Sequence, residues 1–101
     1  MNDPAMPLSL DLSDEGSRPY FLWDTVLTVR DLKALLRSPD TNVKIYWMAR
    51  VLRDARYSDV WQLVNLREVL THWEVLRTRL GREQARWEFL IDGWRSDGLI
   101  E

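Results

Sequence analysis

Apolar residues recur at helical spacing along most of the chain after residue 28. The most regular stripe consists of Leu66, Val69, Leu70, Trp73, Leu76 and Leu80. A second stripe, near the end of the chain, consists of Trp87, Leu90, Ile91 and Trp94. Because residues three and four apart share one face of a helix, each stripe predicts an amphipathic helix packed on a core. No segment after residue 28 alternates as a strand does. The pattern therefore predicts an all-α domain, a compact bundle of four or five short helices.

Residues typical of helix ends give the expected bounds. The expected helices cover residues 29–37, 39–55, 59–64, 66–80 and 83–96. Their expected N-caps, whose side chains accept hydrogen bonds from the first backbone amides, are Thr28, Ser38, Ser58 and Asn65. Gly81 is expected to end the fourth helix, and Gly98 with Leu99 to end the fifth in a Schellman motif.

Residues 1–19 are expected to form a flexible acidic tail, and residues 20–101 a single helical domain. The tail holds three of the four prolines together with several serines and aspartates, and it buries too little apolar surface to offset its ordering entropy. Leu8, Leu10 and Leu12 alternate with polar residues, as in a strand. They are either chance leucines in a disordered tail or a segment that adds to a partner's sheet.

Four large apolar residues, Tyr20, Phe21, Leu22 and Trp23, follow the tail. We expect them to fold back on the helices as a lid, with part of the run left exposed as an interface anchor, where Tyr and Trp are favoured. Phe89 lies on the opposite side of its expected helix from the apolar stripe. Such a two-sided helix is either central in the bundle or a partner surface, and burial is the expected outcome. A chain this small with six tryptophans could still leave an apolar patch uncovered.

The second expected helix carries a polar face with three arginines nearby. Tyr46, Arg50 and Arg53 recur at spacings of four and three, and Arg56 follows at the end of the helix. Two interpretations remain open. The arginines form local ion pairs on a solvated face, or they recognise anions on a partner protein or a nucleic-acid backbone. A pI near 5.4 disfavours nucleic-acid binding as the main activity.

The composition offers few side chains that could carry out catalysis. The chain has 101 residues, no cysteine and one histidine, His72, so thiolate sites and multi-histidine metal sites are excluded. Phosphate-binding glycine loops are also missing from the sequence. We therefore expect one domain that is not an enzyme and binds no cofactor or metal. The sequence has no membrane-spanning apolar run and no secretory signal pattern, so we expect a cytoplasmic protein.

Several aromatic and arginine-rich segments carry a family resemblance. They are Pro19–Asp24 (PYFLWD), Tyr46–Arg56 (YWMARVLRDAR), Asp59–Trp61 (DVW), Leu80–Arg82 (LGR), Trp87–Leu90 (WEFL) and Gly93–Trp94 (GW). Together they resemble small helical bacterial proteins encoded beside nucleotidyltransferase-like toxins of the abortive-infection type. The resemblance implies an antitoxin whose partner transfers nucleotides to an RNA acceptor. It implies no catalytic residues in the small protein, and it leaves open whether the toxin is masked or modified.

The expected function is therefore direct binding of a cognate protein, a nucleotidyltransferase-like toxin by the resemblance. The expected partner-binding residues are Tyr20, Phe21, Trp23, Tyr46, Arg50, Arg53 and Arg56. Two alternatives are a helical adaptor or self-associating module, and, less favoured, a nucleic-acid-binding protein that uses the arginines.

Overall fold

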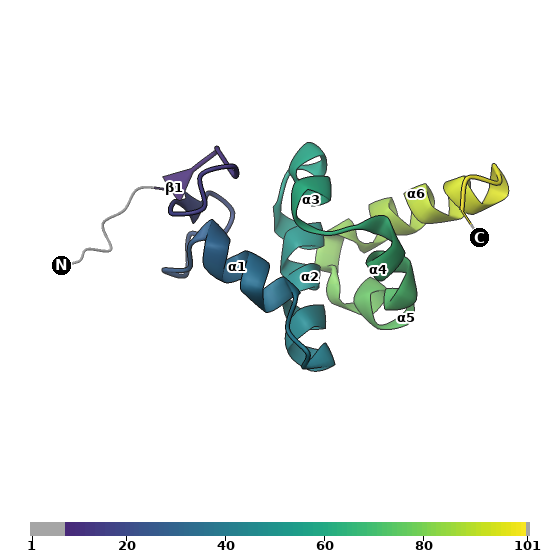
Figure 1. The fold of residues 1–101 in the computed structure, drawn as a ribbon. Helices are drawn as coiled ribbons and strands as arrows, with labels where there is room; N and C mark the ends of the chain where they lie inside the picture. The colour runs from purple at the N-terminus through teal and green to yellow at the C-terminus, as the bar shows by residue number, and fades with distance from the viewer. Residues whose placement is uncertain (1–7, 101) are drawn as a thin grey trace.

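The computed structural model describes residues 8–100, and this part of the chain is mainly helical. Its helices are α1 (Val29–Leu36), α2 (Thr41–Asp54), α3 (Tyr57–Leu63), α4 (Leu66–Thr71), α5 (Trp73–Leu76) and α6 (Gln84–Ser96). Two 3₁₀ turns, Arg77–Arg79 and Gly81–Glu83, join α5 to α6. Helix α2 is central and packs against α1, α3 and α5, while α6 extends past the other helices at one end of the molecule (Figure 1). The prediction of a helical domain is confirmed, with a small sheet in addition.

That sheet has two parallel strands, β1 (Leu8–Ser9) and β2 (Arg18–Pro19), which lie inside the segment expected to be a free tail. Leu12, which lies between the two strands in the sequence, is buried, with 4% of its surface exposed. The expectation of a flexible tail up to residue 19 is therefore corrected for residues 8–19. Residues 1–7 lie outside the described residues.

Backbone hydrogen bonds explain why this segment is ordered. The Val29 amide donates to the Ser17 carbonyl over 2.8 Å, and the Arg30 amide donates to the Glu15 carbonyl over 3.0 Å. The first amides of a helix have no partner inside the helix, so the segment satisfies two of them at the start of α1. Composition alone shows neither these bonds nor the burial of a single leucine.

Two of the four predicted N-caps are confirmed. Thr28 accepts from the Asp31 amide over 3.2 Å, and the Asp31 carboxylate accepts from the Thr28 amide, which completes a capping box. Asn65 accepts from the Glu68 amide over 2.8 Å at the start of α4. Gly98 is also confirmed as the end of α6, where it has φ +76° and the Leu99 amide donates to the Trp94 carbonyl.

The other two N-caps were predicted wrongly. Asp40, not Ser38, caps α2, and its carboxylate accepts from two backbone amides. A carboxylate satisfies both amides at once, and the Ser38 hydroxyl instead accepts from the Asp40 amide. Helix α3 begins at Tyr57, so Ser58 lies inside it rather than capping it.

The predicted helix over 66–80 is also interrupted, because α4 ends at Thr71 and α5 begins at Trp73. The Thr71 hydroxyl donates to the Arg67 carbonyl four residues earlier, a bond that often bends helices. The break still leaves Trp73 and Leu76 buried, so the apolar stripe correctly predicts the side that faces the core.

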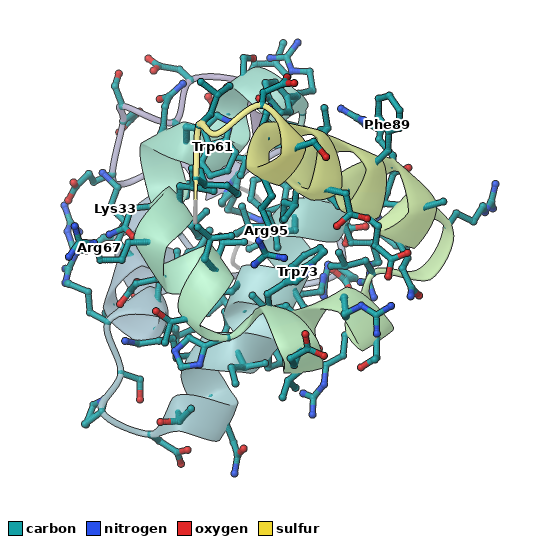
Figure 2. The ribbon with its side chains drawn as sticks, turned by 90° about the vertical axis from the view of Figure 1, so that its right-hand side faces the viewer. Lys33, Trp61, Arg67, Trp73, Phe89 and Arg95 are labelled. Atoms are coloured by element: carbon teal, nitrogen blue, oxygen red, sulfur yellow. The ribbon has the colours of Figure 1, made fainter. Side chains whose placement is uncertain are left out.

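Helix α6 is attached to the core by Trp87. This side chain is 1% exposed, and its indole Nε1 donates to the Leu52 carbonyl over 2.8 Å. Its ring also packs against those of Tyr57 and Trp61. Phe89, two residues later, is 76% exposed, so the expectation that it is buried was wrong. Trp87 and Ile91 already fill the side of α6 that faces the core, and Phe89 points away from the other helices (Figure 2).

Candidate functional site

An exposed apolar surface lies where the chain turns between the lid segment and α1. Trp23 and Val26 are both 72% exposed, and Tyr46 on α2 is 50% exposed. Tyr46 packs edge-on against Trp47, and Trp47 lines the same hollow as Trp23 and Val26. We call Trp23, Val26 and Tyr46 the Trp23 face. Large exposed aromatic side chains of this kind serve as anchors at protein interfaces.

The residues before Trp23 hold it in place. Phe21 and Leu22 are buried, which is the lid expected from the sequence, while Trp23 stays outside it. The Tyr20 hydroxyl donates to the Asp59 carboxylate over 2.6 Å and accepts from the Arg56 amide over 2.7 Å. The lid is thereby attached to the start of α3.

A network of paired charges lies beside the Trp23 face and lines a hollow of about 380 Å³. The Arg50 side chain is only 9% exposed, and it donates to Asp24 over 2.9 Å and to Asp54 over 3.0 Å. Arg53 donates to both carboxylate oxygens of Asp54 over 3.0 Å. The interpretation as a solvated face is therefore incorrect for the Arg50 side chain, which is buried, whereas its partners Asp24 and Asp54 remain partly exposed.

The pairing shifts the pKa values of these groups. Hydrogen bonds from Arg50 hold the pKa of Asp24 below its usual value. Burial alone would lower the pKa of Arg50, but its hydrogen bonds with Asp24, Tyr46 and Asp54 raise it instead. The Asp54 hydrogen bond likewise raises the pKa of Arg53. The shifts favour the charged forms of Asp24, Arg50 and Arg53.

Arg56 is separate from this network. Its guanidinium lies 5.1 Å from the centre of the Tyr20 ring, and its Nε donates to Asp59 over 3.3 Å. Each of the three predicted arginines therefore already has a carboxylate partner within the chain. These are the local ion pairs of the first interpretation, and they leave little unpaired positive charge for a phosphate.

The structure brings Tyr20, Phe21, Trp23, Tyr46, Arg50 and Arg53 to one region, with Arg56 at its edge. Sequence reasoning missed Val26 and the role of Asp24. Neither has a recognisable motif. Val26 resembles any other apolar residue before a helix, and the partner of Asp24 is 26 positions away in sequence.

Within residues 8–100, no three His, Asp or Glu side chains lie close enough together to hold a metal ion. None of the helices in the same range is long and apolar enough to cross a membrane. Comparison with protein-family models, curated proteins and solved structures finds no match to this chain.

Proposed function

We propose that this chain is a protein-binding antitoxin that contacts its partner through the Trp23 face. The observation that carries the proposal is the 72% exposure of Trp23 on a turn that buried neighbours hold in place. A bulky anchor that is already ordered loses little conformational entropy on binding. The resemblance of the sequence supports a nucleotidyltransferase-like toxin as the partner.

The charges around this face favour a protein partner over a nucleic acid. Arg50 and Arg53 are paired with Asp24 and Asp54, so their positive charge is balanced before any partner arrives. Binding to a phosphate backbone would weaken steeply with added salt, because counterions are released. Insertion of Trp23 into an apolar pocket should depend only weakly on salt.

The first test is neutralisation in cells. The neighbouring toxin is expressed alone, with the wild-type protein, and with Trp23→Ala. We expect the wild type to restore growth and Trp23→Ala to fail, because truncating an anchor of this kind costs about tenfold or more in affinity. Equal growth inhibition with and without the wild-type protein would show that it is not the antitoxin of that toxin.

A matched variant separates loss of binding from loss of folding. Phe89→Ala removes an aromatic side chain of similar exposure from α6, away from the Trp23 face. In calorimetric titration with purified toxin, Phe89→Ala should bind as the wild type does, and Trp23→Ala should not. Both variants should keep the wild-type melting temperature. Wild-type affinity in Trp23→Ala would place the interface elsewhere.

Affinity purification with a C-terminal tag tests the more general claim of a protein partner. We expect the toxin to be recovered with the wild type at about 50 mM and at about 500 mM salt alike, and to be lost with Trp23→Ala. Binding that depends on phosphate contacts weakens steeply over about this range of salt concentration. Recovery of RNA that disappears at the higher salt concentration would instead favour the nucleic-acid alternative.

A further inference from the structure

The turn that carries Trp23 and Val26 belongs to no helix or strand. Among the described residues, a single backbone-to-backbone hydrogen bond ties residues 23–26, from the Thr25 amide to the Leu22 carbonyl over 3.1 Å. A segment with so few backbone bonds opens easily unless side chains hold it. In this turn, two arginines from other parts of the fold supply that hold.

Arg18 binds the backbone of the turn from β2. Its Nη2 donates to the Thr25 carbonyl over 2.7 Å and to the Trp23 carbonyl over 3.4 Å. Arg18 also lines the same hollow as Trp23 and Val26. Hydrogen bonds from a charged donor are roughly twice as strong as those between neutral groups. One guanidinium therefore restrains the backbone on both sides of Asp24.

Arg50 binds the middle of the turn from α2. Its Nη2 and Nη1 donate to the two carboxylate oxygens of Asp24 over 2.9 Å and 3.4 Å. A two-pronged contact of this kind fixes direction as well as distance. The Arg50 side chain is itself buried and bonded to Asp54, so it is a firm support. Bonds from these two arginines thus reach three successive residues of the turn.

We propose that Arg18 is a positioning residue for the Trp23 face, which it keeps in the shape that the partner binds. The proposal rests on the proposed function, since it takes Trp23 to be the anchor. A partner that meets an ordered turn does not have to supply the free energy of ordering it. Because Arg18 belongs to β2, the docking of residues 8–19 sets the affinity of the Trp23 face.

Three variants isolate this role. Arg18→Met removes the donors and keeps an unbranched side chain of similar length. Arg18→Lys keeps a charged donor and should preserve more order in the turn than Arg18→Met does. Arg30→Met is the matched control, because the Arg30 side chain is 69% exposed and lies 3.9 Å from Glu15, in an ion pair outside the turn.

Backbone relaxation NMR on the full chain tests the positioning without any partner. In the wild type and in Arg30→Met, the amides of residues 23–26 should have the order parameters of rigid backbone, about 0.85. In Arg18→Met they should fall below about 0.6. The Val29 amide, which donates to the Ser17 carbonyl, should stay protected from hydrogen exchange in every variant.

Two results of this experiment would overturn the proposal. One is a turn in Arg18→Met that is as rigid as in the wild type. The other is loss of protection at Val29 in Arg18→Met, because the arginine would then hold the whole segment 8–19 rather than the turn.

Calorimetric titration with purified toxin tests the consequence for binding. Arg18→Met should bind about tenfold more weakly than the wild type, since the partner must now order the turn. Arg30→Met should bind as the wild type does. Wild-type affinity in Arg18→Met would overturn the proposal while leaving Trp23 as the anchor. Wild-type affinity in Trp23→Ala would overturn the proposed function, and with it the role of Arg18 in binding, whereas the order of the turn would still be decided by the relaxation data.

Discussion

Tyr20→Phe removes one oxygen atom from the contact that holds the lid on α3, and it should destabilise the protein. The Tyr20 hydroxyl donates to Asp59 and accepts from the Arg56 amide. Asp59 is 6% exposed, so water replaces the lost donor poorly. The ring of Tyr20 remains in the variant, which isolates the contribution of the hydroxyl group.

The expected cost is about 2 kcal/mol, because a hydrogen bond to a charged group contributes roughly 1.5–3 kcal/mol. Asp59 keeps its bonds from Arg56 and Gln62, which limits the loss. For a domain of this length, a cost of that size lowers the melting temperature by about 10 °C.

Urea unfolding followed by tryptophan fluorescence measures the difference. Tyr57→Phe is the matched control, because no hydrogen bond of the Tyr57 hydroxyl is found among residues 8–100, and its cost should be within about 0.5 kcal/mol of zero. Equal stabilities for Tyr20→Phe and the wild type would refute the claim that this hydroxyl attaches the lid.

The same contact should make the stability of the protein depend on pH in the alkaline range. Burial first, and then the hydrogen bond to Asp59, raise the pKa of Tyr20 above its usual value of 10.0. The neutral phenol is thus favoured in the folded state. The contribution of the neutral Tyr20 phenol to the free energy of unfolding is complete below pH 10. It is lost as the pH rises through the higher pKa of the folded state. Stability should fall above pH 10 in the wild type and fall less in Tyr20→Phe.

Three further predictions concern other parts of the fold. Trp87→Phe should cost about 2 kcal/mol in urea unfolding, because the Leu52 carbonyl loses its buried donor; an unchanged midpoint would contradict this. Gly93→Ala should raise stability by about 0.5–1 kcal/mol in thermal melts, since alanine favours the helix and its Cβ would meet no atom within 4 Å. Asp24→Asn should make the free energy of unfolding depend less on pH in the acid range. Arg50 lowers the folded pKa of Asp24, so the stabilisation by this pair is present above pH 3.8 and is lost as the pH falls through the lower folded value.

Local sequence signals predicted the helical part of the fold well. The capping box at Thr28 and the Schellman ending at Gly98 involve atoms only a few residues apart, so their chemistry is visible in the sequence. Where two local signals compete, sequence reasoning failed. Ser38 and Asp40 both lie before α2, and only the backbone path shows which one reaches the first amides.

Long-range contacts account for the rest of the differences. The order of residues 8–19 depends on carbonyls that meet the start of α1, and the burial of Arg50 depends on Asp24, which is 26 positions away. Phe89 was misjudged for a related reason. A helical wheel shows that α6 has two apolar sides, but it does not show how many neighbours the fold supplies.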